Sequence, residues 1–326
     1  MSEGVIISED DDGQRLDRWL KKHYPDFAFG QLQKILRTGQ LRVDGKRAKG
    51  ETRLVKGQTI RIPPQLLAPA PERKKGLSPR DIDFIKSLVI YKDQHVMALN
   101  KPSGLAVQGG SKIERHVDGL LDGLKDSEDA PRPRLVHRLD RDTSGVLLLA
   151  RTTLAAQMLG DQFKGRDIRK YYWAVTSPAP AQHQGKITVP LAKRDAGGGE
   201  RVMAADEEDG KSALTYYQVM ETVGDKLAWV AFWPRTGRTH QIRVHALEIG
   251  CPLLGDYKYE EQQAFLAENP NLPRTLHLHA RRIILPHPVT GKTLDITAPL
   301  DPEMKKTFKY FGFNADDKSD PFDILD

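Results

Sequence analysis

The side chains with the greatest chemical potential gather in one short stretch, VHRLDRDTSGVLLLART, residues 136–152. It carries two aspartates, a histidine and three arginines, and it runs directly into the strand-like segment VLLLA. Asp140 stands just before this apolar run, where a polar loop meets the core. A carboxylate at such a boundary is partly shielded from water, so its protonation and reactivity depend on its neighbours. Asp140 is therefore the candidate functional carboxylate.

The neighbouring DTSG, residues 142–145, also matches the short signature of aspartic proteases. In those enzymes two carboxylates share one proton, which requires a second Asp-Thr-Gly or Asp-Ser-Gly segment. The sequence contains no second copy. We interpret residues 142–145 as a turn whose polar side chains satisfy backbone amides before the strand begins.

Metal and cofactor sites are not expected. His240, His245, His277 and His279 could in principle gather at a metal, but the sequence has no HExxH motif and no Cys/His ligand spacing. The single Cys251 excludes an internal disulfide. No glycine-rich segment is followed by the lysine of a phosphate-binding loop.

Several separated segments together indicate a family. HRLDRDTSG (137–145), KYYWA (170–174), RTGRTHQIRVH (235–245), GD (255–256) and LHA (278–280) follow one another as the motifs of RluA-type pseudouridine synthases do, and this chain resembles that family. NKPSGL (100–105) also fits. The resemblance extends from about residue 88 to about residue 300, and it is greatest to the ribosomal large subunit enzymes of the C type.

The resemblance implies a chemistry that needs no cofactor. The bond between ribose C1′ and uracil N1 breaks, the base rotates in place, and C1′ joins C5. Asp140 corresponds to the catalytic carboxylate of the family and Arg243 to the arginine that pairs with it. Addition of Asp140 to C6, capture of C1′ and proton abstraction at C2′ all remain open, and we favour assisted glycosidic cleavage through a glycal-like intermediate.

Further substrate contacts are carried over from the same motifs. Tyr172 alternates with Tyr171 and Trp173 along an expected strand, so it lies on the face opposite theirs. The resemblance implies that Tyr172 faces the active site and stacks on the uracil, while Tyr171 and Trp173 belong to the core. Arg138 corresponds to an arginine that enters the space left by a flipped uridine. By the same resemblance we expect His137, Lys101, Thr239 and His240 to contact the substrate.

The basic residues are concentrated near the N-terminus. Residues 13–62 hold 13 Lys and Arg against 4 Asp and Glu. Leu16, Trp19 and Leu20 recur at helical spacing, and a second helical pattern and two short strand patterns follow. This arrangement resembles the S4 RNA-binding domain. We therefore expect RNA phosphates to contact its basic residues, namely Lys34, Arg37, Arg42, Lys46 and Arg47.

The order of elements predicts the domains and the fold class. We expect an S4-like domain at residues 1–66, a proline-rich linker at 67–84, a catalytic domain at 85–315 and a mobile acidic tail at 316–326. Strands and helices do not alternate regularly from residue 85 onward, which indicates an α+β fold with a mixed, mostly antiparallel sheet and flanking helices. The small N-terminal domain is itself expected to be α/β.

The expected partner is 23S ribosomal RNA or a large-subunit precursor. No apolar run reaches the roughly 18 residues of a membrane-spanning helix, so we expect a cytoplasmic protein, with a monomer as the default. Two other function classes stay open: a ribosome assembly factor that binds RNA without catalysis, and an Asp-dependent hydrolase. Asp140, Tyr172 and Arg243 together favour the synthase over both.

Overall fold

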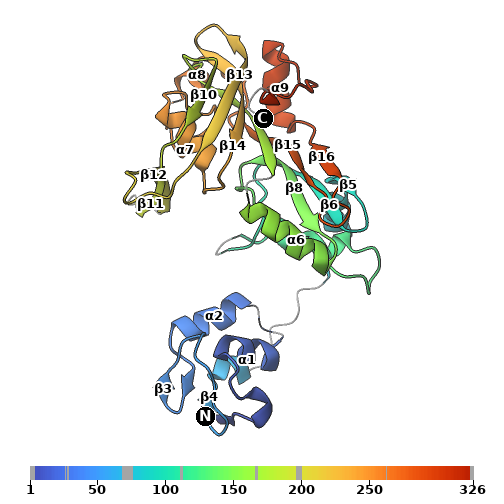
Figure 1. Cartoon of the computed structure of the whole chain (residues 1–326), viewed down its shortest axis with the longest axis vertical. Coiled ribbons are helices and arrows are strands. Elements are labelled where there is room, and N and C mark those ends of the chain that lie inside the picture. The colour runs from blue at the N-terminus through green and yellow to red at the C-terminus, as the bar shows by residue number, and fades with distance from the viewer. Residues whose placement is uncertain are drawn as a thin grey trace. The chain divides into compact units, whose positions relative to one another are not determined.

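The protein is described by a computed structural model that covers residues 4–25, 27, 29–67, 76–110, 113–165, 168–195, 200–261 and 263–323. The chain divides into two units, Met1–Gly76 and Leu77–Asp326 (Figure 1). Each unit has its own hydrophobic core. Of the expected linker, residues 68–75 lie outside the described residues, whereas Pro79–Ser87 form a helix whose Ile85 is fully buried in the second unit.

The N-terminal unit contains the predicted helices and strands. Its elements are β1 (Gly4–Ile6), η1 (Glu9–Asp11), α1 (Leu16–His23), α2 (Phe29–Arg37), β2 (Arg42–Val43), β3 (Lys46–Arg47), β4 (Thr59–Arg61) and α3 (Pro64–Leu67). The strands form one sheet in the order β1-β4-β2-β3. Asp44 and Gly45 both have positive φ, as a tight turn between β2 and β3 requires. The two helices bury their apolar faces, including Trp19 and Leu20, against this sheet.

A buried carboxylate fastens the start of this unit to α1. Asp11 is only 3% exposed and accepts hydrogen bonds from Trp19 Nε1 at 3.1 Å and Lys22 Nζ at 2.7 Å. His23 Nε2 lies 2.9 Å from the same carboxylate, and Ser8 Oγ donates to it at 3.3 Å. The hydrogen bond from Lys22, together with those from His23 and Trp19, outweighs burial and lowers the pKa of Asp11 to about 2.

The second unit is built from a longer set of elements. They are α4 (Pro79–Ser87), β5 (Val89–Lys92), β6 (Val96–Lys101), α5 (Val117–Leu120), η2 (Leu121–Leu124), β7 (Arg134–Leu135), β8 (Ser144–Ala150), α6 (Thr153–Lys164), β9 (Arg169–Thr176), β10 (Gln184–Ile187), β11 (Leu191–Asp195), β12 (Glu200–Ala204), β13 (Thr215–Val223), β14 (Leu227–Pro234), α7 (Gln241–Glu248), α8 (Ala264–Glu268), β15 (Leu278–Pro286), β16 (Thr293–Thr297) and α9 (Pro302–Phe311).

One large sheet organises these elements and confirms the predicted mixed α+β architecture. Its main path runs β10-β13-β14-β9-β15-β8-β6-β5, with β16 beside β15 and β7 beside β8. Only β8 and β15 pair in parallel, and every other pair in this sheet is antiparallel. At that parallel pairing Gly145 has φ +105°, and a Cβ there would stand 2.2 Å from the carbonyl oxygen of Ala280. Glycine at this position therefore permits the close approach of the two central strands.

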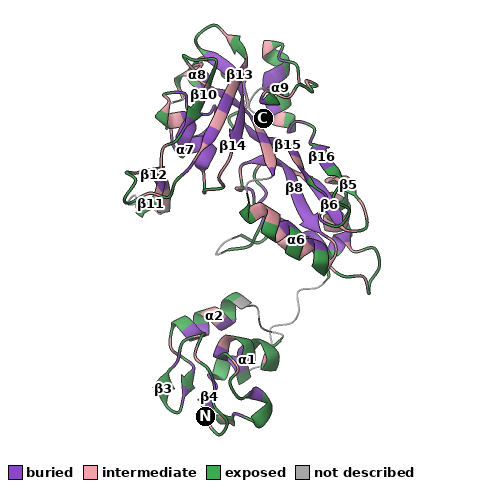
Figure 2. Cartoon of the chain, viewed as in Figure 1, coloured by how far each residue is buried: buried purple, intermediate pink, exposed green. Residues whose placement is uncertain are grey.

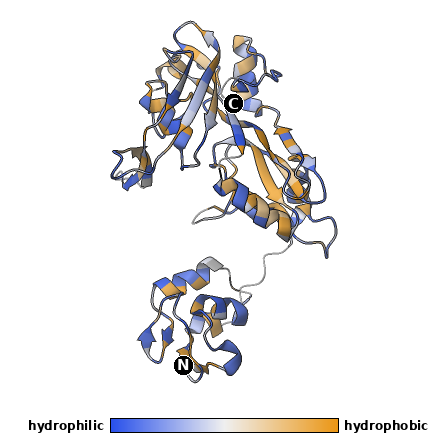
Figure 3. Cartoon of the chain, in the orientation of Figure 1, coloured by the Kyte–Doolittle hydropathy of each residue, from blue (hydrophilic) through white to orange (hydrophobic). Residues whose placement is uncertain are grey.

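Helices cover both faces of the sheet (Figure 1). α7 packs on Ala174 and Val230, whereas α9 packs on Trp173 and Trp229, the alternate residues of the same two strands. α6 covers the β8 end of the sheet, where the strands carry continuous apolar side chains (Figures 2 and 3). None of the helices within the described ranges is long and apolar enough to cross a bilayer.

The sequence expectation of a mobile C-terminal tail was wrong. The expected acidic tail is anchored as far as the structure describes it, because Phe322 is 1% exposed and packs with Tyr171 and Trp233. Tyr171 also donates its hydroxyl to Asp320 at 3.2 Å. Elsewhere in this unit, Leu191–Asp195 (β11) and Glu200–Ala204 (β12) pair as antiparallel strands.

The carboxylate of Asp11 gives the N-terminal unit a predictable response to acid. A lowered pKa contributes stability that is present above the unfolded value of 3.8 and is lost as the pH falls toward about 2. We expect Asp11→Asn to destabilise this unit at neutral pH by about 1–3 kcal/mol and to flatten its loss of stability below pH 4. Hydrogen exchange of peptides from residues 4–25 in the full chain, corrected for intrinsic rates, measures both effects. The exposed neighbour Asp10→Asn is the control, and equal behaviour of the two variants would contradict the assignment.

Candidate active site

A cavity of about 350 Å³ lies where the centre of the sheet meets the loop before α7. This volume is within the usual range of ligand pockets. Its wall is formed by Val136, His137, Arg138, Leu139, Asp140, Thr143, Phe163, Lys170, Tyr172, Pro234, Thr236, Gly237, Arg238, Thr239, His240, Gln241, Ile242, Arg243 and Leu278. Four parts of the sequence, around residues 136–143, 163–172, 234–243 and 278, thus converge on one space, and they include every predicted catalytic residue.

Asp140 enters the cavity from the loop that precedes β8. A turn holds this loop, because the backbone N–H of Thr143 donates to the carbonyl of Asp140 at 3.2 Å. Ser144 then begins the strand, with its hydroxyl 2.8 Å from Nδ1 of His279 on β15. The turn is as interpreted, but Asp142 contacts Arg141 and Ser144 contacts His279 where backbone amides were expected. The turn delivers a partly exposed Asp140 to the cavity wall.

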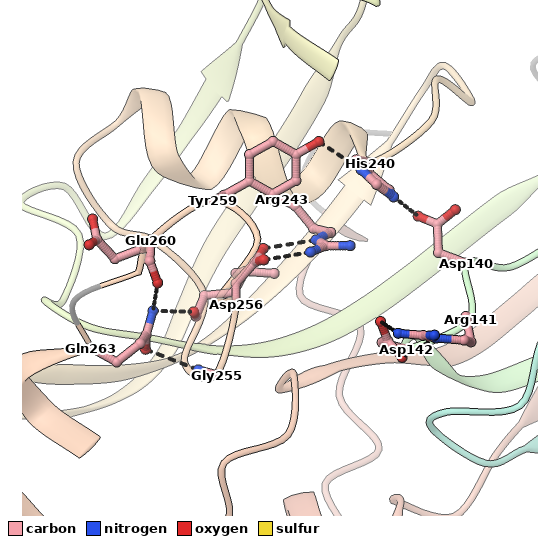
Figure 4. Close-up of polar contacts among 11 residues, drawn as sticks. Asp140, Arg141, Asp142, His240, Arg243, Gly255, Asp256, Tyr259, Glu260 and Gln263 are labelled. Carbon is pink, nitrogen blue, oxygen red and sulfur yellow. Dashed lines mark hydrogen bonds and ion pairs between the residues drawn. The ribbon is translucent and has the colours of Figure 1, made fainter. Parts of the chain in front are cut away.

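Arg243 does not use Asp140 as its hydrogen-bonded partner, contrary to expectation. Its Nε donates to Asp256 Oδ2 at 2.8 Å and its Nη2 to Asp256 Oδ1 at 2.5 Å, with both side chains buried (Figure 4). Burial opposes the charge of Arg243, but the hydrogen bonds and charge of Asp256 raise the pKa of Arg243 above its ordinary value. Tyr259 and Asp140 add smaller contributions in the same direction. Arg243 therefore lies near Asp140 as a cation already balanced by Asp256.

His240 is the side chain that faces the carboxylate of Asp140. Its Nε2 lies 3.8 Å from Asp140 Oδ2 (Figure 4). Burial, with a smaller effect of Arg243, outweighs the charge of Asp140 and lowers the pKa of His240 to about 4. At neutral pH this imidazole is uncharged, so its contact with Asp140 is that of a dipole with a charge.

Tyr172 faces the cavity from β9, as the resemblance implied. Tyr171 and Trp173 are 2% and 4% exposed and belong to the core on the other face. Burial, with the nearby charge of Asp140, raises the pKa of the Tyr172 hydroxyl above its ordinary value. The phenol therefore stays protonated at neutral pH and presents a ring and an O–H group to the cavity.

Lys101 was expected to contact the substrate, and this expectation was wrong. Its side chain is fully buried, and Nζ donates to the carbonyls of Pro102, Leu105 and Arg141 at 2.9, 2.8 and 2.9 Å. All three ammonium protons are thus engaged by backbone. Burial lowers the pKa of Lys101 to about 8, against the opposing charges of nearby aspartates. Lys101 fastens the loop that follows Asp140 and does not line the cavity.

The other predicted contacts lie on the cavity wall. His137 stacks on Phe163 at 4.4 Å, and its Nε2 accepts the backbone N–H of Leu148 at 2.8 Å. Burial lowers the pKa of His137 to about 3, so the ring is neutral. Arg138 and Thr239 are both exposed at the rim of the cavity.

The loop between β14 and α7 is fixed by a buried glutamine. Gln241 Oε1 accepts the hydroxyl of Thr236 at 2.8 Å and the backbone N–H of Arg238 at 3.0 Å. Its Nε2 donates to the carbonyl of Leu214 at 3.0 Å and to Thr215 Oγ1 at 2.9 Å. With four polar contacts around one amide, the position of the cavity wall is set by the protein itself.

Sequence reasoning missed several members of the site. Gln241 and Lys170 lie within the quoted motifs, and Asp256 belongs to the GD segment, so a signal existed for them but no role was assigned. Lys170 lines the cavity with a pKa lowered by burial and by Arg235. Tyr259 carried no sequence signal. Its part in the site follows only from the fold.

Metal and cofactor ligands do not gather here. In the described parts of the chain, no three His, Cys, Asp or Glu side chains are placed so that they could hold a metal ion. His245, His277 and His279 are buried and form hydrogen bonds with Thr215, Thr307 and Ser144 at 2.9, 2.7 and 2.8 Å. These three histidines connect elements of the fold.

Comparison with known proteins relates this arrangement to one family. The model of the family described as RNA pseudouridylate synthase matches residues 95–248. That segment contains Asp140, Tyr172 and Arg243.

Curated relatives match over most of their length. Ribosomal large subunit pseudouridine synthase C of Rickettsia bellii is 37% identical over 291 residues, covering 88% of this chain and 94% of the relative. The protein of the same name from Escherichia coli is 36% identical over 309 residues, covering 93% and 94%. Among solved structures, human RNA pseudouridylate synthase domain containing 4 has a TM-score of 0.60 at 27% identity and covers 71% of this chain and 96% of its own.

The buried pair of Arg243 and Asp256 makes a large stability difference predictable. Removing one partner of a buried ion pair leaves an uncompensated charge, so we expect Asp256→Ala to lower the free energy of unfolding by roughly 3–5 kcal/mol. The exposed pair of Arg141 and Asp142, 2.9 Å apart in the loop of Asp140, offers a matched control. We expect Asp142→Ala to cost less than about 1 kcal/mol. Urea unfolding of both variants measures the contrast, and similar costs would refute the buried pair.

Proposed function

This chain belongs to the RNA pseudouridylate synthase family and is an RNA pseudouridine synthase, and we propose that it converts specific uridines of large-subunit (23S) ribosomal RNA to pseudouridine. The RNA class is supported by the names of the relatives, which are ribosomal large subunit enzymes. A cytoplasmic location accompanies a substrate of this kind.

The observation that carries the catalytic assignment is the placement of Asp140. Asp140 lines the same cavity as Tyr172, and the nearby Arg243 is a cation that is already paired with Asp256. A carboxylate in this setting can act as a base or a nucleophile, because neither Arg243 nor a neutral His240 removes its charge by proton transfer. We propose Asp140 as the catalytic residue.

The reaction balances without an added reagent. In the route we favour, Asp140 takes the C2′ proton as the bond from C1′ to N1 breaks, and the electron pair of that bond leaves with uracil. The glycal and the uracil anion remain in the cavity, where the base rotates. C5 then bonds to C1′ while Asp140 returns its proton to C2′. Loss of the C5 proton and gain of a proton at N1 complete the isomerisation.

Tyr172 is proposed to hold the base during this rotation. Its raised pKa keeps the phenol protonated at neutral pH, so the hydroxyl does not accept a proton, and the ring is free to stack. An aromatic face tolerates rotation of the uracil in its plane, whereas a set of directed hydrogen bonds would resist it. The O–H group remains able to donate to the anionic base.

Two cations at the cavity, Arg138 and Lys170, are proposed to contact the RNA around the flipped uridine. A uridine must leave its stack to reach Asp140, and extrusion costs least in loops and bulges. Arg138 at the rim is proposed to occupy the space that the uridine vacates. Lys170, which has no carboxylate partner within the described ranges, is placed to meet a phosphate of the flipped nucleotide.

The N-terminal unit is proposed to be an S4-like RNA-binding domain. Its five predicted contact residues, Lys34, Arg37, Arg42, Lys46 and Arg47, are all exposed and come from α2 and the β2–β3 hairpin. Arg47 Nη2 donates to the carbonyl of Arg37 at 2.6 Å, which brings the two elements together. One-signed charge on adjoining elements supports binding of phosphates.

The enzymatic proposal is tested by mapping pseudouridine on RNA. Large-subunit rRNA is incubated with wild-type protein, Asp140→Asn or Asp142→Asn, treated with carbodiimide and read by primer extension. We expect adduct stops with the wild type and with Asp142→Asn, and none above background with Asp140→Asn. RNA affinity should change little in either variant. Turnover by Asp140→Asn would sink the catalytic assignment, and absence of stops with the wild type on both naked rRNA and immature subunits would favour an assembly factor.

A second prediction concerns the N-terminal unit. Replacement of its five proposed contact residues by glutamine should weaken binding to large-subunit rRNA and reduce the slope of log K against log salt by up to about 4, since each phosphate contact contributes about 0.7–0.9. Deletion of residues 1–66 should do the same while leaving single-turnover chemistry at saturating protein largely intact. Filter binding across a salt series measures the slope, and an unchanged slope would contradict the proposal.

A further inference from the structure

A chain of polar contacts leads from the β11–β12 hairpin to the carboxylate of Asp140. Tyr259 is 7% exposed and packs with Val202 of β12 and Val244 of α7. Its hydroxyl lies 2.7 Å from Nδ1 of His240, and the backbone of Val202 is close enough to lower the pKa of that hydroxyl. The opposite nitrogen of the same imidazole, Nε2, faces Asp140 at 3.8 Å (Figure 4).

The protons in this chain have a defined direction. Burial, against the opposing effect of Arg243, raises the pKa of Tyr259 to about 12, so its hydroxyl keeps its proton. Because the hydroxyl keeps its proton and its oxygen lies 2.7 Å from His240 Nδ1, it can donate that proton to Nδ1. A neutral imidazole whose Nδ1 accepts must carry its proton on Nε2. His240 therefore points an N–H group, and not a lone pair, at the carboxylate of Asp140.

The backbone of His240 is held in a costly conformation that fits this role. Its φ of +53° is left-handed, which a residue with a Cβ adopts at a cost of roughly 1–2 kcal/mol. The first turn of α7 holds it there, since Val244 N–H donates to the carbonyl of His240 at 3.0 Å. Such strain persists where the surroundings enforce one placement of a side chain.

We propose that Tyr259 and His240 are positioning residues for the isomerisation, which hold a neutral N–H donor against the carboxylate of Asp140 from a support on the β11–β12 hairpin. This inference rests on the proposed function of Asp140. The donor orients the carboxylate, and a neutral imidazole has no second ring proton to transfer to it. At 3.8 Å the contact is longer than a hydrogen bond, and contacts of this kind commonly tighten when substrate binds.

The β11–β12 hairpin contacts Tyr259 through two neighbouring residues of β12, Arg201 and Val202. Arg201 of β12 lies over the Tyr259 ring at 5.0 Å, and Arg243 lies 5.0 Å from the same ring. Val202 is 5% exposed and shares the core cluster of Tyr259. A shift of the hairpin therefore moves the tyrosine hydroxyl, and through it the tautomer and orientation of His240.

The first experiment reads the chain without reference to activity. Histidine labelled with ¹⁵N is introduced into wild-type protein, Tyr259→Phe and the control Tyr257→Phe, whose tyrosine is 41% exposed. At neutral pH we expect His240 of the wild type and of the control to show a protonated Nε2 and an unprotonated Nδ1. Tyr259→Phe should give a mixture of tautomers. A protonated Nδ1 in the wild type would overturn the inference.

The second experiment separates positioning from folding and binding. Release of tritium from [5-³H]uridine in large-subunit rRNA gives the single-turnover rate constant. We expect Tyr259→Phe to lower it about tenfold, the effect of one hydrogen bond, with RNA affinity and melting temperature unchanged. His240→Gln, which keeps an amide N–H near the position of Nε2, should retain more activity than His240→Leu.

A double variant decides whether Tyr259 acts through His240. If it does, adding Tyr259→Phe to His240→Leu should cause no further loss, because the donor is already absent. Full additivity, or a wild-type rate in Tyr259→Phe, would overturn the proposal while leaving the catalytic assignment of Asp140 intact. Absence of tritium release by the wild type would instead defeat the proposed function and the positioning role with it, whatever tautomer His240 shows.

Discussion

The buried pair of Arg243 and Asp256 is the constraint on which the site depends. Its two bonds of 2.8 and 2.5 Å connect the first turn of α7 to the segment after Gly255. Gly255 has φ +77°, and a Cβ there would stand 2.0 Å from the carbonyl oxygen of Thr275. The pair thus joins α7 to the turn at Gly255 and Asp256, which packs closely against Thr275 just before β15. Both His240 and the loop before α7 take their positions from this junction.

The pair also shapes the electrostatics of the cavity. Because Asp256 balances Arg243, the guanidinium can lie near Asp140 without neutralising it. Other ionisable neighbours are held uncharged by burial, which lowers the pKa of His240 to about 4 and raises that of Tyr172 above its ordinary value. The carboxylate of Asp140 consequently has a neutral imidazole and a compensated cation near it, while Arg138 and Lys170 also line the cavity. This environment suits a group that must take up and return a proton within one reaction.

Local sequence patterns predicted the orientation of side chains but not their partners. Alternation along β9 predicted that Tyr172 lies on the other face from Tyr171 and Trp173. The apolar run after Asp140 predicted the central strand. The partner of Arg243 and the buried position of Lys101 depend on how distant segments approach each other, which no local period encodes. The acidic composition around Phe322 led to the prediction of a mobile tail. The ring of Phe322 instead packs on Tyr171 and Trp233 and anchors that segment. The overall architecture was therefore more predictable than the hydrogen-bond network of the site.

Backbone conformations that ordinary residues avoid surround this site at three points. Gly145 and Gly255 permit close contacts with β15 and with the segment before it, and His240 is left-handed despite its side chain. Gly145 lies at the start of β8 and His240 directly before α7, whereas Gly255 lies in the turn next to Asp256. An isomerase of this kind must hold both halves of a broken substrate while one of them rotates, so freedom in the walls would let the base escape. The close contacts at Gly145 and Gly255 make the surrounding protein rigid, so that the uracil is the part that rotates.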